Sequence, residues 1–196
     1  MTTIPLFPLN IVLFPDGPLP LRIFETRYVD MVRDCMRQDR GFGVVLIREG
    51  REVGPAETFD VGTMAKITDF DQLPDGLLGL TCVGQQRFRI VTRRVAKDGL
   101  NVVDVEWLTT EPRLEVPPRH ARLSRLLQLV LPQLGEVYTG IDMRLDDAAW
   151  VGHRLAEILP LQLTAKQDFL EMNDPVQRLD ALAPLAPGES GGEGDA

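Results

Sequence analysis

Two proline-containing dipeptides near the middle of the chain constrain its fold more than any other feature. They are Glu111-Pro112 and Pro117-Pro118. Proline disfavours the helical conformation in the residue before it and cannot donate to a strand ladder, so no helix or central strand crosses this segment. Strand patterns precede it and helix patterns follow it. We therefore predict a β part over residues 1–111, a linker over 112–119 and a helical bundle over 120–183.

The β part combines short strands with a single early helix. Apolar residues recur at helical spacing from Tyr28 to Met36, within a predicted helix over about residues 25–39. Phe42 to Ile47 is a continuous apolar run, which is typical of a strand covered on both faces. Pro74-Asp75-Gly76 and Asp98-Gly99 each predict a turn followed by a strand. Because no strand–helix–strand alternation occurs, the pattern predicts an α+β fold with an antiparallel barrel or curled sheet.

The helical part contains four segments with apolar stripes. Asp146-Asp147 and Asp174-Pro175 provide side-chain acceptors at two helix starts, and Thr164 with Gln167 predicts a capping box at a third. Residues 184–196 are rich in proline, glycine and acidic residues and have no apolar period. We predict that this tail is disordered.

The charge balance disfavours nucleic acid and membrane surfaces as partners. The 196 residues include 21 Lys and Arg against 29 Asp and Glu, a net charge of −8, which repels phosphate backbones and anionic lipids. The amino terminus lacks the charged start of a secretory signal, and no apolar run reaches the ~20 residues that span a bilayer. We expect a cytoplasmic protein in which Cys35 and Cys82 are buried thiols.

No sequence pattern predicts an enzyme, a cofactor or a metal site. None of the lysines lies in a phosphate-binding loop, and His120 and His153 are too far apart for a metal-binding pair. Ser190 lies in a G-x-S-x-G sequence but has no preceding strand, following helix or later histidine. Ser124 follows His120 by one helical turn, without a third group to orient the histidine. Hydrolysis through either serine is therefore the weakest hypothesis.

A short basic cluster is the feature that favours RNA. Phe88 is interleaved with its arginines, as in many nucleic-acid-binding surfaces. In a strand, however, the first two arginines project to the face opposite Phe88, where Asp104 and Glu106 of the next strand can neutralise them. A solvated sheet face is the favoured interpretation, and RNA contact is the alternative. The cluster consists of Arg87, Arg89, Arg93 and Arg94.

Several blocks of sequence occur in an order and at a spacing that match a known family. They are Ile4-Pro-Leu-Phe-Pro-Leu-Asn-Ile-Val-Leu-Phe-Pro15, Leu19-Pro-Leu-Arg-Ile-Phe-Glu25 with Arg27-Tyr28, Phe42-Gly-Val-Val-Leu-Ile47, Val61-Gly-Thr-Met-Ala65, Gly84 with Arg87-Phe-Arg-Ile90, and Leu159-Pro-Leu-Gln-Leu163 with Lys166-Gln167 and Leu170-Glu171. Together they resemble the amino-terminal substrate-recognition domain of Lon ATP-dependent proteases. The resemblance covers about residues 3–182.

The resemblance implies a PUA-like β part that carries one helix and is followed by a helical bundle. In a full Lon protease an ATPase and a Ser/Lys peptidase follow this region, and this chain ends after the bundle. We therefore expect a stand-alone, non-enzymatic module without cofactors that recognises unfolded or apolar peptide segments of other proteins. A separately encoded protease is a further expected partner, and RNA binding is the alternative function, since PUA-like folds are used in that way.

Neither the residues nor the resemblance places the binding groove. The charged residues in the otherwise apolar block from Leu19 to Glu25 must be paired or solvated. We predict that Arg22 and Glu25 form a structural ion pair at the junction between strand and helix.

Overall fold

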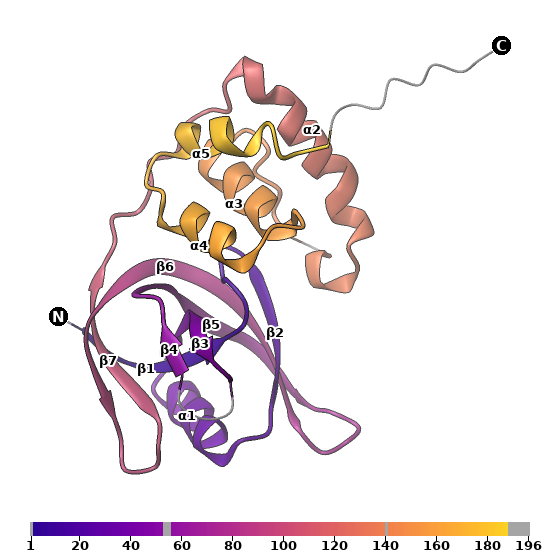
Figure 1. The fold of residues 1–196 in the computed structure, drawn as a ribbon. Helices are drawn as coiled ribbons and strands as arrows, with labels where there is room; N and C mark the ends of the chain where they lie inside the picture. Colours follow the sequence, from indigo (N-terminus) through magenta and orange to yellow (C-terminus); the bar gives the residue numbers. More distant parts are fainter. Residues whose placement is uncertain (1, 53–55, 140, 188–196) are drawn as a thin grey trace.

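The computed structural model describes residues 2–52, 56–139 and 141–187. In these ranges, seven strands form one sheet, and four of the five α-helices gather on one side of it (Figure 1). The strands are β1 (Thr2–Leu9), β2 (Pro18–Ile23), β3 (Phe42–Gly50), β4 (Ala56–Thr58), β5 (Val61–Gln72), β6 (Leu78–Val95) and β7 (Asn101–Trp107). The helices are α1 (Thr26–Arg37), α2 (Ala121–Val130), α3 (Ala148–Ile158), α4 (Leu163–Glu171) and α5 (Pro175–Leu182). No helix in the described ranges is long and apolar enough to cross a membrane.

The sheet is curled and mainly antiparallel, which confirms the predicted α+β class. Its strand order is β1-β7-β6-β5-β3-β4, and β2 pairs with the first part of β6. Strand β1 also pairs in parallel with β3, so the pairing returns to the first strand without forming a simple barrel. The 18-residue strand β6 joins β2, β5 and β7. It is therefore the strand that connects most of the sheet.

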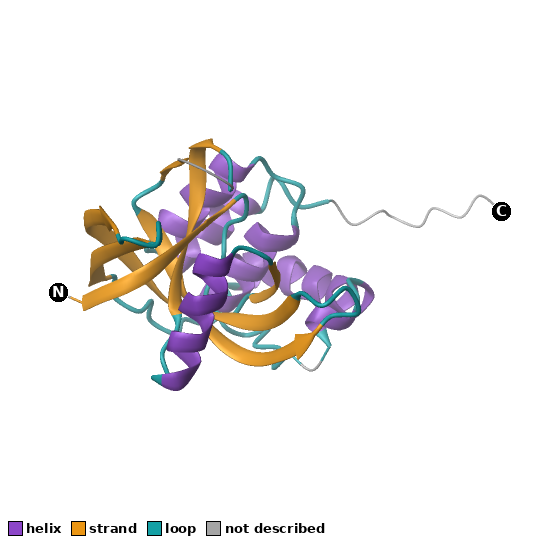
Figure 2. Cartoon of the chain, turned by 90° about the horizontal axis from the view of Figure 1, so that it is seen from below, coloured by secondary structure: helices purple, strands orange, loops and turns teal. Residues whose placement is uncertain are grey.

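Helix α1 confirms the predicted early helix. It lies on the side of the sheet opposite α2–α5 (Figure 1) and stands in front of the strands when the molecule is viewed from below (Figure 2). Met36 was predicted to belong to its apolar stripe but is 39% exposed. The residues buried against the sheet are Tyr28, Met31, Val32 and Cys35.

The predicted central strand and turns are also confirmed. Residues 42–47 of β3 are all buried, and β3 lies between β1 and β5 in the sheet. Gly76 and Gly99 have φ values of +83° and +82° in the turns that join β5 to β6 and β6 to β7. Glycine adopts this left-handed conformation without steric cost, so these two turn sequences specify the two hairpins.

Two of the three predicted helix caps are present. The Asp147 carboxylate accepts from Ala149 N at 3.0 Å, and the Asp174 carboxylate accepts from Val176 N at 2.9 Å. The capping box predicted at Thr164 is wrong, because α4 begins at Leu163 and no side chain caps it. The Gln167 amide donates to Val61 O at 3.0 Å, so this side chain joins α4 to the sheet.

The β and helical parts share one hydrophobic core. Val12, Phe14 and Val61 from the β part pack in the same buried cluster as the apolar faces of α2, α3, α4 and α5. The segment between the two parts is also held, since Ala148 N at the start of α3 donates to Leu114 O at 2.8 Å. The helical part is therefore packed against the sheet rather than tethered to it by a free linker.

The packed part of the chain extends further than predicted. Residues 188–196 of the predicted disordered tail lie outside the described residues, but residues 184–187 are described. Ala186 is 7% exposed and packs in the helical core. Arg122 donates to the backbone oxygens of Ala183 and Pro187. The helical part therefore continues to residue 187 instead of ending at 183, because Ala186 fills space between the helices.

Candidate functional site

An exposed phenylalanine on β5 marks the candidate binding surface. Phe70 is 56% exposed and lies near the tip of the β5–β6 hairpin, which projects away from α2–α5 (Figure 1). Three hollows of about 580, 470 and 700 Å³ all include this side chain. The first two lie between α1 and β5, and the third lies between β2 and the hairpin. Phe70 is therefore the point at which three adjoining hollows meet.

The groove between α1 and β5 comprises the first two of these hollows. Because α1 buries its opposite stripe in the core, its outer flank, with Val29 and Met36, faces this groove. Met36 belongs to both hollows, and Leu77 of the hairpin lines the second. Charged side chains, including Lys66 and Asp71, lie along the rim. An apolar centre with a charged rim is the usual arrangement of surfaces that bind other polypeptides.

The side chains considered for chemistry make other contacts in the described part of the chain. Burial raises the pKa of Cys35, which lines the groove, and a protonated thiol is a weak nucleophile. The Ser124–His120 pair does not form, because the serine hydroxyl donates to Leu145 O at 2.8 Å and His120 Nε2 lies 2.6 Å from Asp180 Oδ1. In the described ranges no three His, Cys, Asp or Glu side chains are placed to hold a metal ion. Ser190 lies outside the described residues.

The predicted Arg22–Glu25 ion pair is wrong. Arg22 forms an ion pair with Asp75 in the β5–β6 turn, and Glu25 forms one with Arg27 at 2.8 Å. The pairing of β2 with β6 places Arg22 opposite Gly79, close to that turn. Strand pairing therefore brings Arg22 to a partner that is distant in sequence.

Replacing Arg22 with alanine should change the free energy of unfolding by less than about 1 kcal/mol, because exposed ion pairs contribute little. The two side chains of the Arg22–Asp75 pair are 64% and 42% exposed. Urea unfolding of the parent protein and of Arg22→Ala measures the change. A loss several times larger would show that this pair holds the hairpin in place.

Three arginines of the predicted basic cluster have exposed side chains. Arg93 pairs with Asp60 at 2.6 Å and Arg94 with Asp104 at 3.2 Å. Arg89 lies opposite Glu106 in the β6–β7 register. The surface is thus neutralised by acidic neighbours, and the RNA-binding alternative finds no support in this geometry.

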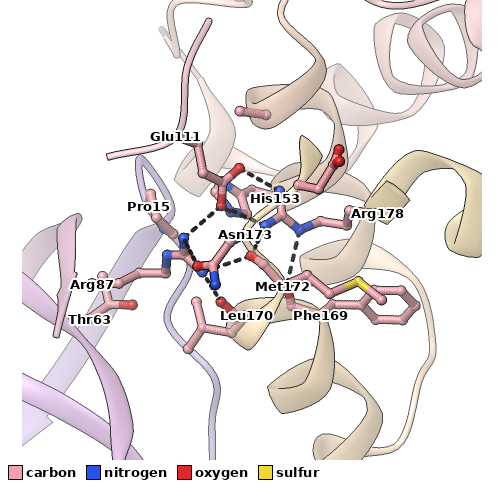
Figure 3. Close-up of polar contacts among 12 residues, drawn as sticks. Pro15, Thr63, Arg87, Glu111, His153, Phe169, Leu170, Met172, Asn173 and Arg178 are labelled. Carbon is pink, nitrogen blue, oxygen red and sulfur yellow. Dashed lines mark hydrogen bonds and ion pairs between the residues drawn. The ribbon is translucent and has the colours of Figure 1, made fainter. Parts of the chain in front are cut away.

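Arg87 differs from the rest of the cluster because it is buried, with 4% of its surface exposed. It donates to the backbone oxygens of Leu170 and Met172, the latter at 2.8 Å, and to Asn173 Oδ1 at 3.1 Å (Figure 3). Its ion pair is with Glu111 at 2.9 Å, rather than with the predicted Asp104 or Glu106. The end of α4 covers this face of β6, so Arg87 cannot reach RNA.

Glu111 is the centre of a buried ion cluster at the junction of the two parts (Figure 3). Arg178 of α5 donates to both of its carboxylate oxygens, at 2.8 and 2.6 Å, and Arg87 of β6 pairs with it from the other side. His153 Nε2 of α3 lies 3.4 Å from Glu111 Oε1. One carboxylate thus joins a strand, the segment between the two parts and two helices.

The cluster shifts the protonation equilibria of both Glu111 and His153. Burial alone would raise the pKa of Glu111, but the contacts with His153 and Arg178 outweigh it and lower the pKa to about 2. Burial lowers the pKa of His153 to about 4, and the charge of Arg178 acts in the same direction. At neutral pH the cluster therefore contains two guanidinium groups, one carboxylate and a neutral imidazole.

The fold and this surface define a class of two-part binding domains, in which a curled sheet presents an apolar groove and a helical bundle is fastened to its other side. The family model described as the ATP-dependent protease La (LON) substrate-binding domain matches residues 3–185. The chain belongs to this family.

Solved structures and curated proteins agree with this assignment. The Lon N-terminal domain protein from Xanthomonas campestris is 41% identical, with a TM-score of 0.79, over 95% of this chain and 100% of that one. The N-terminal domain of Lon protease from the Mycobacterium avium complex has a TM-score of 0.63 at 18% identity, over 94% of this chain and 97% of that one, and shows the same fold. Lon proteases of Erwinia amylovora and Escherichia coli are each 30% identical over 95% of this chain. The chain spans about 25% of the length of these two relatives.

Sequence reasoning missed both Phe70 and the Glu111 cluster. Phe70 stands between Asp69 and Asp71, a weak sign of an apolar side chain on a solvated strand. Arg178 lies beside Leu179 in the apolar stripe of α5, where a charged side chain indicates a buried partner. Nothing local identifies Glu111 as that partner.

Proposed function

We propose that this chain recognises unfolded segments of other proteins through the surface around Phe70. The supporting observation is that one exposed aromatic side chain joins three hollows on a hairpin that the helical bundle leaves uncovered. Membership of the Lon substrate-binding domain family supports a role in substrate recognition. A folded protein buries its apolar side chains, so a surface of this kind selects chains that expose them.

The physical basis of this recognition is removal of apolar area from water. Each Å² of apolar surface that is buried contributes about 25 cal/mol, and phenylalanine has a large area to contribute. Met36 and Leu77 line the hollows beside Phe70 and add to the apolar area. The net charge of −8 acts against acidic partners, including nucleic acids.

Replacing Phe70 with serine should weaken binding of an unfolded protein by about tenfold or more, while the melting temperature changes little. Fluorescence anisotropy with labelled ribonuclease A, reduced and alkylated with iodoacetamide so that it is unfolded without added negative charge, measures the affinity. Val95→Ser is the matched control, because Val95 is 69% exposed and lies at the end of β6, near the other hairpin. Equal binding by the parent protein and Phe70→Ser would place recognition elsewhere on the molecule.

The recognition proposed here serves proteolysis. Relatives that share this domain are named Lon protease, and the domain is about 25% of their length. By analogy with these relatives, the bound segment is passed to a protease that acts after recognition. Co-purification of a protease with the tagged chain from its own cells tests this step, and Phe70→Ser should retain the protease because this surface binds the unfolded segment.

A further inference from the structure

One edge of β5 has no strand partner along half of its length. Strand β5 pairs with β3 only over residues 63–65, whereas its pairing with β6 continues to Gln72. No other described strand pairs with β5. The edge from Lys66 to Gln72 therefore lies open at the position where β3 would continue if the chain did not turn there into α1.

Two backbone donors point out of this open edge. Phe70 N donates to the Asp69 carboxylate at 2.8 Å, and Gln72 N donates to the Asp71 carboxylate at 2.7 Å. Neither donor is therefore engaged in the ladder with β6. In an antiparallel strand the N–H and C=O of one residue point to the same side, so Phe70 and Gln72 present both groups to the open edge.

The open edge faces the groove between α1 and β5. The two hollows of this groove follow β5 from Met64 to Gln72, and they share Met36 and Phe70. An extended chain rises about 3.3 Å per residue, so a segment of about six residues would match this edge. Its side chains would alternate between the apolar hollows and the rim.

We propose that an extended segment of an unfolded polypeptide binds by adding a strand to β5, and that segments alternating apolar with basic residues bind best. This inference rests on the proposed function and specifies its geometry. Carbonyl oxygens of the incoming strand accept from the N–H groups of Phe70 and Gln72 and displace the carboxylates of Asp69 and Asp71. The two released carboxylates then pair with lysine or arginine of the bound segment.

The first test uses labelled peptides of about ten residues that alternate leucine and arginine, a length that exceeds the open edge. Two further versions are N-methylated at every leucine or at every arginine, which removes the donors from one edge of the peptide strand or from the other. We expect one methylated version to bind about tenfold or more weakly and the other to bind like the parent peptide. Equal affinities of the two methylated versions would overturn the proposal.

The second test changes the protein edge itself. Gln72→Pro removes an outward N–H without removing a ladder hydrogen bond to β6, and proline is tolerated at such edge positions. Gln72→Ala is the matched control, because it keeps the N–H and removes the same side chain. We expect about tenfold weaker peptide binding by Gln72→Pro, unchanged binding by Gln72→Ala, and similar melting temperatures for both.

The remaining outcomes separate this inference from the proposed function. If Gln72→Pro and Gln72→Ala bind the peptide equally while Phe70→Ser does not, side-chain recognition stands and strand addition is wrong. A leucine–glutamate peptide that binds as well as the leucine–arginine peptide would contradict the role of Asp69 and Asp71. A parent protein that is a dimer on size-exclusion chromatography, and a monomer as Gln72→Pro, would assign the edge to a second copy of the chain and overturn the proposal.

Discussion

Glu111→Gln should lower the free energy of unfolding by about 3–5 kcal/mol, the largest effect expected from a single polar substitution in this protein. The carboxylate is the shared partner of Arg87 and Arg178, which are 4% and 0% exposed. Removing its charge leaves two guanidinium groups buried without a counterion. Chemical denaturation followed by circular dichroism measures the loss.

The matched control for Glu111→Gln is Asp146→Asn. Asp146 also pairs with an arginine, Arg113, at 2.8 Å, but both side chains are 67% exposed. The same chemical change should therefore cost only a small fraction of the loss expected for Glu111→Gln. Similar losses in the two variants would show that burial of the Glu111 cluster does not determine its contribution.

The second large effect concerns pH. Burial lowers the pKa of His153 from 6.5 to about 4. As the pH falls, the unfolded chain therefore binds a proton at this position at a higher pH than the folded chain does. The stability that comes from the neutral imidazole is complete above pH 6.5 and is lost as the pH falls to about 4. Since one pKa unit corresponds to about 1.4 kcal/mol, we expect a contribution of about 3 kcal/mol. Denaturant unfolding at intervals between pH 7 and pH 4 measures it.

His153→Gln removes the titrating group and therefore isolates the contribution of His153 to the pH dependence of stability. Its unfolding free energy should fall less steeply between pH 6.5 and pH 4 than that of the parent protein. The chain contains two histidines, so His120→Gln, which keeps His153, is the matched control and should retain the His153 contribution. A parent-like slope in His153→Gln would assign the pH dependence to other groups.

Local patterns predicted most of the elements because the interactions that specify them are local. The stripe from Tyr28 to Cys35 is buried in α1, Gly76 and Gly99 form the hairpin turns, and Asp147 and Asp174 cap α3 and α5. The turns and caps join residues within a few positions of each other, and helical spacing of apolar residues specifies α1 whichever strands it packs against. The capping box at Thr164 failed because α4 already begins at Leu163, which places Thr164 inside the helix rather than at its N-cap.

The candidate site could not be located in the same way. Phe70 belongs to the candidate site because α1 and the β5–β6 hairpin lie side by side and leave a groove between them. The open edge of β5 exists because its pairing with β3 ends at Ala65. The groove and the open edge both depend on which strands pair and where their pairing ends. The spacing of apolar residues in the sequence does not predict either of these.

The sequence by itself determined the family, the α+β class, the early helix and the main turns. It also determined that Arg87 projects to the face of β6 opposite Phe88, because side chains alternate along a strand. Only the tertiary structure decided that this face is covered. The groups that bury Arg87 come from Leu170 and Met172, more than 80 positions later in the chain. Alternation is a property of neighbouring residues, whereas burial is decided by whichever distant element packs against them.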